Sequence, residues 1–181
     1  MKNKAVKLST LVVFALSLLI SCGKSGGEDT KKIDPLAAAA STTPEDIQKA
    51  KEERLANLPE NTLEIEGDDN MKYDLTELKV KAGKPITLTL KHVGKASITD
   101  MGHNWVVLKQ GTDLEAFAQK AAKDVANNYI PNDPVIIAHT KLLGGGETDT
   151  IIFTIDEKGT YDYLCTFPAH NTTMRGKLIV E

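Results

Sequence analysis

The chain has 181 residues, a length that allows one domain with a substantial core but not two comfortable ones. Hydrophobic residues make up 41% and charged residues 26%, which is typical of a soluble globular protein, and the formal net charge is −3. The sequence contains no basic stripe and no nucleic-acid-binding motif, so nucleic acid is excluded as an expected partner.

Residues 1–21 have the pattern of a signal peptide. Three lysines precede an apolar run that is too short to span a bilayer comfortably. The run ends in LLISC, which resembles the lipobox of bacterial lipoproteins and implies that Cys22 is the lipidated first residue of the mature protein. A plain secretory signal followed by a chance cysteine is the alternative. Either interpretation places the protein outside the cytoplasm, and removal of the three lysines would bring the net charge to −6.

Residues 22–61 are expected to form a flexible tether that can include a short helix at 44–58. Glycine, serine, alanine and charged residues dominate 22–42, as in flexible linkers. Pro44 suits the first position of a helix, and Pro59 would end it. Because the apolar stripe between them is thin, a marginal helix and a disordered segment both remain open.

Residues 62–181 form one domain in which the hydrophobic pattern changes to a period of two, typical of β-strands. The expected strands are TLEIE (62–66), two short strands around a turn in MKYDLTELKVKAG (71–83), ITLTLKH (86–92), HNWVVL (103–108), VIIAHT (135–140), DTIIFTI (149–155), TYDYLC (160–165) and GKLIVE (176–181). One segment, at about 113–127, has helical spacing instead, with Asp113 as its cap. Many short strands with one inserted helix indicate an all-β fold, an antiparallel sandwich or barrel.

The segment CTFPAHNTTM brings a cysteine, a histidine and a methionine close together in sequence. Cys165 shares a strand face with two tyrosines, and His103 shares one with Trp105, so both side chains are expected to point inward. Because Cys165 ends its strand, the loop that follows can bring His170 and Met174 to the same point. Several ligands would then converge at one end of the barrel.

Thiolate, imidazole and thioether together form a soft ligand set. Thioether is a poor ligand for zinc and a good one for copper, and two histidines, one cysteine and a distant methionine are the ligands of blue-copper sites. Zinc bound by cysteine and histidine remains open, although zinc does not need Met174. A bound metal would also protect Cys165, otherwise a lone thiol in an oxidising compartment.

Three segments resemble the cupredoxins, and among them the azurins, with auracyanin-like copper proteins close behind: MGHNW (101–105), IAHTKLLGGGE (137–147) and CTFPAHNTTM (165–174). A fourth segment, GDDNMKYD, matches more weakly. The resemblance covers 62–181 in the family's order. It implies a Greek-key β-sandwich or barrel with one inserted helix, holding a single type 1 copper ion.

The resemblance also implies a role for each candidate ligand. His103, Cys165 and His170 would be the three strong equatorial ligands of copper. Met174 would be the weak axial ligand, and the Gly102 carbonyl the axial contact on the opposite side.

Neighbouring residues receive supporting roles from the same resemblance. Asn104 would join the ligand loops by side-chain hydrogen bonds, and the Phe167 N–H would point at the cysteine sulfur. Trp105 would lie in the core. His92 is expected to be a partly buried non-ligand, and His139 a surface residue.

Two departures from the azurins leave the ligands untouched. The disulfide near the first strands is missing, since its positions lack cysteine around KAGK (81–84), so the N-terminal hairpin is expected to hold by packing alone. Ala169 stands where the family usually has glycine.

The expected function is single-electron transfer without any enzymatic activity. The expected partners are redox proteins such as c-type cytochromes or copper oxidoreductases, and the protein would be a monomer lipid-anchored on the periplasmic or cell-surface side of a bacterial membrane. A carrier that delivers copper without redox cycling is the main alternative. A Cys-His hydrolase would leave Met174 and MGHNW unexplained, and a copper enzyme would need a second histidine cluster.

Overall fold

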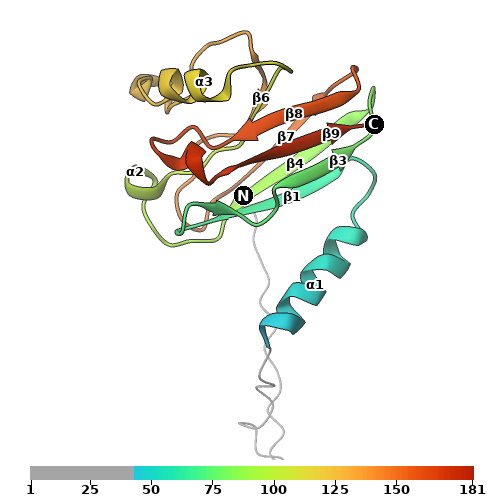
Figure 1. Cartoon of the computed structure of the whole chain (residues 1–181). Coiled ribbons are helices and arrows are strands. Elements are labelled where there is room, and N and C mark those ends of the chain that lie inside the picture. Colours follow the sequence, from blue (N-terminus) through green and yellow to red (C-terminus); the bar gives the residue numbers. More distant parts are fainter. Residues whose placement is uncertain (1–42) are drawn as a thin grey trace, which may run out of the picture. The chain divides into compact units, whose positions relative to one another are not determined.

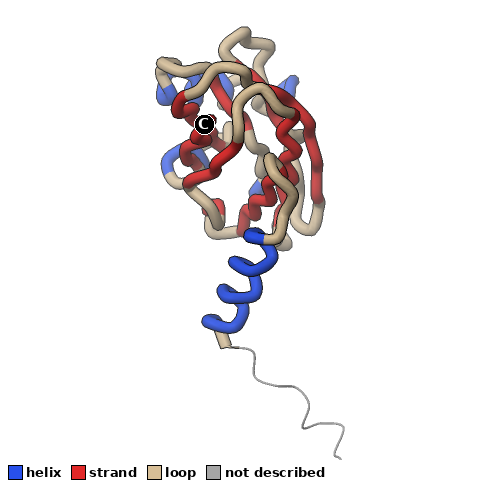
Figure 2. Tube along the Cα trace, turned by 90° about the vertical axis from the view of Figure 1, so that its right-hand side faces the viewer, coloured by secondary structure: helices blue, strands red, loops and turns tan. Residues whose placement is uncertain are grey.

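The computed structural model describes residues 43–181 (Figures 1 and 2). The predicted signal peptide and Cys22 lie outside the described residues. Within 43–181, no helix combines the length and apolar character that crossing a membrane would require.

The described chain begins with helix α1 (Pro44–Ala56). The Thr43 hydroxyl accepts from the Asp46 N–H at 3.1 Å, and the Asp46 carboxylate accepts from the Thr43 N–H at 3.0 Å, which together make a capping box. Proline at the first helical position completes this start signal. No residue of α1 is buried and only Leu55 among its apolar residues is half-buried, so apolar packing contributes little to holding the helix in place.

Ion pairs attach α1 to the outer side of strand β1 (Thr62–Asp68). Lys51 Nζ lies 3.0 Å from a Glu66 carboxylate oxygen and 2.5 Å from one of Asp74. Arg54 pairs with both Glu64 and Glu66. We call these contacts of Lys51 and Arg54 the helix clasp. Because it consists of partly exposed charges alone, ions in the solvent will weaken it.

Replacing both Lys51 and Arg54 by alanine is expected to release α1 without affecting the barrel. Each such pair contributes about 0.2–1 kcal/mol, and an isolated helix of this length is marginal in water. Amide hydrogen exchange should therefore accelerate in 44–56 and stay unchanged in the barrel strands. Lys49→Ala, on the same helix but in no ion pair of the described chain, is the control. Equal exchange in the double variant and the control would contradict the clasp.

Within residues 43–181, nine strands form two sheets packed face to face, which confirms the all-β fold (Figure 1). The first sheet has the order β2-β1-β4-β7, with β2 (Lys72–Tyr73), β4 (Pro85–His92) and β7 (Thr148–Thr154) beside β1. The second sheet has the order β3-β9-β8-β5-β6, formed by β3 (Glu77–Val80), β9 (Arg175–Val180), β8 (Gly159–Leu164), β5 (Val106–Leu108) and β6 (Ile136–His139).

The sheets are mixed rather than purely antiparallel, which corrects the expectation from sequence. β1 pairs parallel with β4, with Ile65 opposite Leu90, and β3 pairs parallel with β9. The cause is the crossover between the sheets. The chain leaves the first sheet after β2, contributes β3 to the second, and returns as β4 beside β1. Period-two patterning identifies strands but carries no information about their direction.

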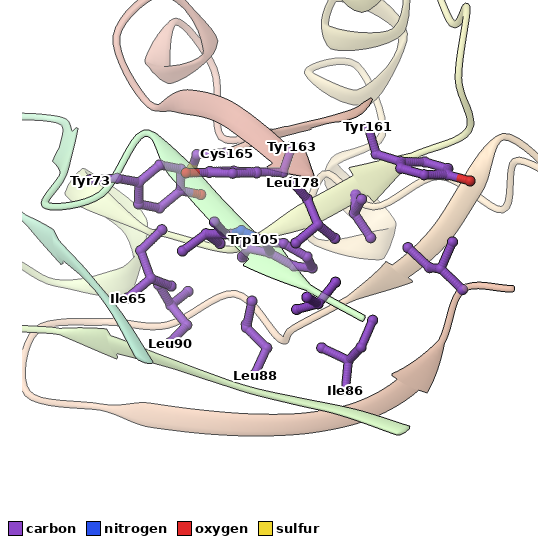
Figure 3. Packing of buried hydrophobic residues seen from close by; sticks show 14 of the residues in the cluster. Ile65, Tyr73, Ile86, Leu88, Leu90, Trp105, Tyr161, Tyr163, Cys165 and Leu178 are labelled. Carbon is purple, nitrogen blue, oxygen red and sulfur yellow. The ribbon is translucent and has the colours of Figure 1, made fainter. Parts of the chain in front are cut away.

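The core fills the space between the sheets. Ile86, Leu88 and Leu90 of β4 are fully buried, whereas the alternating threonines face outward, as predicted. Trp105 and Tyr163 lie at the centre of this core with their rings 5.4 Å apart (Figure 3). Rings of this size contribute much of the buried apolar surface of a small domain.

Helix α3 (Leu114–Ala121) creates a second, smaller core on the outside of the second sheet (Figure 1). The buried residues of this cluster are Val106, Leu108, Phe117, Ala118, Ala121 and Leu164. Strand β5 is therefore buried on both faces. Asp113 caps α3 as predicted, accepting from the Ala116 N–H at 3.0 Å.

The inserted helix is shorter than the predicted range of about 113–127. After α3 the chain turns and forms only a 3-10 turn, η1 (Val125–Asn127), before Asn128 and Tyr129 adopt positive φ angles. Val125, which fits the apolar stripe of a continued helix, is instead 64% exposed. A second short helix, α2 (Ile98–Met101), and a 3-10 turn, η2 (His170–Thr172), were not predicted.

Asn61 provides a bridge at the place where the azurin-type disulfide is missing. Its side-chain amide donates to the Lys81 carbonyl at 2.9 Å and accepts from the Lys81 N–H at 2.7 Å. The start of β1 is thereby joined to the turn before β4 by two hydrogen bonds. The expectation that packing alone holds this hairpin was therefore wrong.

Candidate metal centre

Three of the predicted ligands converge at one end of the barrel. The donor atoms of His103, Cys165 and His170 all lie within 4.8 Å of one another. Cys165 Sγ is 3.7 Å from Nδ1 of His170. The three residues are 0–2% exposed, so water is largely excluded from the space between them.

His103 is positioned by backbone bridges rather than by a regular strand. Its N–H donates to the Leu143 carbonyl at 3.0 Å, and the Leu143 N–H donates back at 2.7 Å. The predicted strand 103–108 begins only at Val106, because side chains capture the preceding backbone groups: the Asn104 carbonyl accepts from the Tyr73 hydroxyl, and the Trp105 N–H donates to the Thr140 hydroxyl.

The imidazole of His103 lies between two backbone carbonyl groups. Its Nε2 lies 2.8 Å from the Asp68 carbonyl oxygen, so a neutral ring with its proton on Nε2 donates to this carbonyl. Nδ1 lies 3.0 Å from the Gly102 carbonyl oxygen, and in that tautomer a lone pair of the ring would face a lone pair of the carbonyl. Two lone pairs at this distance repel each other unless a cation lies nearby. This arrangement, together with the buried sulfur, fits a metal ion.

Cys165 follows β8 directly and places its sulfur between two loops. The backbone N–H groups of Asn104 and Phe167 donate to the sulfur and lower its pKa, but burial dominates and raises the pKa of the thiol to about 11. The predicted contact from Phe167 is therefore present, and the contact from Asn104 is additional. The Gly102 carbonyl oxygen lies 3.9 Å from the sulfur.

Both candidate histidine ligands are neutral at physiological pH. Burial, together with the nearby rings of His103 and His92, lowers the pKa of His170 to about 4. The pKa of His103 is also below its usual value, chiefly because of burial. Neutral imidazole is the form that binds a metal, so neither ring must lose a proton first.

Met174 is fully buried beside the same space. A Cβ added to Gly67 would lie 3.1 Å from the Met174 methyl carbon and 3.0 Å from Cδ2 of His103, so the methionine side chain and this imidazole flank the same glycine. Backbone hydrogen bonds close the loop between Cys165 and Met174. The Met174 carbonyl accepts from the Cys165 N–H at 2.9 Å, and the Met174 N–H donates to the His170 carbonyl at 2.8 Å.

Asn104 joins the two ligand-bearing segments. Its side chain donates to the Thr166 hydroxyl at 2.7 Å and accepts from the Thr166 N–H at 2.8 Å. Both residues are buried, so breaking these bonds would leave polar groups without partners in the protein interior and would destabilise the fold. The role predicted for Asn104 is confirmed.

His92 and His139 do not contribute donor atoms to this group. His92 is buried and stacks on His103, with ring centroids 4.1 Å apart. Its Nδ1 accepts from the Gly94 N–H at 3.1 Å and its Nε2 donates to the Met101 carbonyl at 2.8 Å, so both ring nitrogens are occupied. His139 is exposed, as predicted. The sequence pattern gave no sign of the ring stacking.

An apolar surface surrounds His170. The ring of Phe167 lies 4.6 Å from that of His170 and packs edge-on against Tyr129 at 5.1 Å. Pro168 is half-buried and Ala169 is exposed. Tyr129 was not expected here, because it comes from the turn after α3. We call Phe167, Pro168, Ala169 and Tyr129 the apolar rim.

Ala169 has a φ angle of 67°, in the left-handed region. Ala169→Gly is expected to stabilise the metal-free protein by about 0.5–1 kcal/mol. Relief of left-handed strain is worth about 1–2 kcal/mol, and the greater freedom of glycine in the unfolded chain offsets about 0.5–1 kcal/mol of it. Urea unfolding checks this value. Ala126→Gly, on the exposed surface, is the control and should lose stability. A loss of stability on Ala169→Gly as well would mean that the loop is not strained.

Comparisons with known proteins agree with this geometry. Residues 59–181 match the family described as copper binding proteins, plastocyanin/azurin family. The chain is 41% identical over 124 residues to azurin-1 of Alcaligenes xylosoxydans xylosoxydans, covering 66% of this chain and 96% of that protein. It is 38% identical over 120 residues to outer membrane protein H.8 of Neisseria gonorrhoeae, covering 63% and 64% respectively. The dithionite-reduced auracyanin of Roseiflexus castenholzii has a similar structure, with a TM-score of 0.61, 38% identity, and coverage of 68% of this chain and 99% of that one.

Proposed function

The chain belongs to the plastocyanin/azurin family of copper-binding proteins, and we propose that it transfers single electrons through one type 1 copper ion. His103, Cys165 and His170 would be its three strong ligands, and Met174 and the Gly102 carbonyl would contribute weaker contacts. The observation that carries the proposal is the convergence of two neutral imidazoles and a buried thiol beside a buried thioether. Copper bound there supplies a one-electron couple between Cu(II) and Cu(I).

The residues around the candidate ligands would hold them in the same positions in both oxidation states of copper. Asn104 fastens the cysteine-bearing segment to the histidine-bearing one, and the Leu143 bridge fixes the backbone of His103. Burial excludes water that would otherwise have to reorient when the charge changes. A buried site from which water is largely excluded favours electron transfer over chemistry on a bound substrate.

The apolar rim would be the docking surface for the redox partner. His170 lies just beneath it at 2% exposure, so an electron would have only this ring to cross between the site and the surface. Weak electron-transfer encounters need only a small interface, which a few apolar side chains can supply. Partners such as c-type cytochromes or copper oxidoreductases fit this role.

The location is proposed from the leader sequence. Lys2, Lys4 and Lys7, the apolar run and LLISC support export and lipid attachment at Cys22, on the periplasmic or cell-surface side of a bacterial membrane. The chain is similar to a protein named outer membrane protein H.8, and this similarity supports the proposed location at a membrane.

Stopped-flow kinetics with a cytochrome partner, combined with competition by a Cu(I) chelator, tests the proposal. The reduced protein should pass its electron on without losing copper to the chelator on the same timescale. Ala169→Asp should slow transfer and leave the copper spectrum nearly unchanged, because it adds a charge to the rim but alters no donor atom. Ile152→Asp, which adds the same charge at a side chain 72% exposed on β7, is the control.

Delivery of copper without redox cycling is the competing function. It predicts rapid loss of Cu(I) to the chelator and transfer rates that do not respond to Ala169→Asp. Those two results together would overturn the electron-transfer proposal.

A further inference from the structure

Two backbone carbonyl groups compete for the ring proton of His103: that of Asp68 lies 2.8 Å from Nε2, and that of Gly102 lies 3.0 Å from Nδ1. Asp68 lies at the end of β1, where the chain turns towards β2. Its own carboxylate is used inside that turn, accepting from the N–H groups of Asn70 and Lys72. These contacts shape the turn but do not tie it to the rest of the barrel.

The Gly67 carbonyl ties one end of the turn to the segment after β4 by accepting from the Val93 N–H at 2.8 Å, and the Met71 carbonyl accepts from the Thr173 hydroxyl at 2.6 Å. Asp69 adds a tie through its side chain. Its carboxylate reaches across to the loop that follows β4 and accepts from the N–H groups of Lys95, at 2.7 Å, and Ala96, at 3.3 Å. Bonds from backbone N–H groups to a carboxylate are stronger than those between neutral partners. Asp69 is itself exposed, so it does not serve as a core residue.

The loop after β4 is shaped to receive this carboxylate. A Cβ added to Gly94 would lie 2.0 Å from an oxygen of Asp69, so any side chain at this position would displace it. The same loop is fixed on its other side, where the Gly145 N–H donates to the Ala96 carbonyl at 2.8 Å. A Cβ on Gly145 would approach the Lys95 backbone to 2.6 Å, so these segments are in close contact.

Each of the three segments that meet around Asp69 also contacts His103. The β1–β2 turn supplies the Asp68 carbonyl, the segment around β4 supplies the stacked ring of His92, and the 143–145 segment supplies the Leu143 bridge. The Asp69 carboxylate thus joins the turn that holds the Asp68 carbonyl to the loop that follows β4 and His92.

We propose that Asp69 is a positioning residue for His103: by fixing the Asp68 carbonyl, its carboxylate keeps the imidazole proton on Nε2 and Nδ1 free to face the site. This role applies to the metal-free protein, and its consequence for copper binding rests on the proposed function. Loss of the carboxylate would let the turn move away and allow the Nδ1–H tautomer, whose proton can bond to the Gly102 carbonyl 3.0 Å away.

Long-range ¹H–¹⁵N NMR of the metal-free full chain tests the proposal directly. The parent should show His103 as the Nε2–H tautomer, and Asp69→Ala should show a mixture of both tautomers. Asp69→Asn keeps an acceptor oxygen in place and should restore the parent state. If Asp69→Ala does not fold, Asp69→Ser, with a side chain too short to span the loops, replaces it.

Asp113→Ala is the matched control, because it also removes a carboxylate that accepts a backbone N–H but does so at the cap of α3. Copper affinity provides a second readout. It should fall about tenfold in Asp69→Ala, the lower end of the effect of residues that orient metal ligands, and stay unchanged in Asp113→Ala.

An unchanged tautomer in Asp69→Ala would overturn the proposal, as would equal tautomer mixtures in Asp69→Ala and Asp69→Asn. Because the NMR readout needs neither copper nor a redox partner, a failure of the positioning role is distinguishable from a failure of electron transfer.

Discussion

Replacing Cys165 by serine is expected to abolish the intense blue colour that the copper-loaded protein should have. In blue-copper sites the strong visible absorption arises from charge transfer between the cysteine thiolate and Cu(II), and a hydroxyl cannot take part in it. Serine is close to cysteine in size, and the N–H groups of Asn104 and Phe167 that face the sulfur can donate to its oxygen. The fold should therefore survive the change.

The measurement is the visible absorption and EPR spectrum of the copper-loaded chain. Near-ultraviolet circular dichroism of the buried Trp105 and Tyr163 reports whether the core is intact. Cys22→Ser provides the control, since it removes the only other cysteine of the sequence and should leave the blue colour unchanged. A blue Cys165→Ser protein, or a colourless parent protein, would exclude Cys165 as a copper ligand.

Much of the barrel can be predicted from the sequence, because β-strands with one buried face have a clear pattern. In β4, Ile86, Leu88 and Leu90 alternate with outward-facing threonines, and the strand lies where the pattern places it. The pattern fails for β5, where Val106, Val107 and Leu108 are all buried because α3 covers the outer face. No local signal in β5 indicates that a helix elsewhere in the chain will cover it.

The candidate site divides in the same way. Cys165, His170 and Met174 occur in one loop, so their approach follows from local sequence, and the family motif adds His103. The Asn61 bridge, the stacking of His92 and the position of Tyr129 beside Phe167 all join residues far apart in the chain. Such contacts depend on how the sheets and loops pack, and the sequence around one residue of a pair does not predict the other.

Copper affinity is expected to rise about tenfold for each unit of pH between roughly pH 7 and pH 10. The metal binds the thiolate, whereas burial keeps the Cys165 thiol protonated in the metal-free protein, with a pKa of about 11. The lowered pKa values of His103 and His170 keep both rings neutral over this range. Binding must therefore release one proton, from Cys165, and raising the pH favours it.

Below about pH 4 the dependence should become steeper, because His170, with a pKa of about 4, then takes up a second proton that copper must displace. Above about pH 11 it should level off, since the thiol is already ionised in the metal-free protein.

Calorimetry at pH 7 in buffers of different ionisation enthalpy counts the released protons, and competition with a chelator of known protonation gives the slope. Cys165→Ser is the internal control: without a thiol, proton release should disappear while any residual binding by the two histidines remains. Release of two protons at pH 7 would show that His103 or His170 is charged in the metal-free protein. Release of none by the parent would show that Cys165 is already a thiolate, which would mean that the amide contacts from Asn104 and Phe167 outweigh the effect of burial on its pKa.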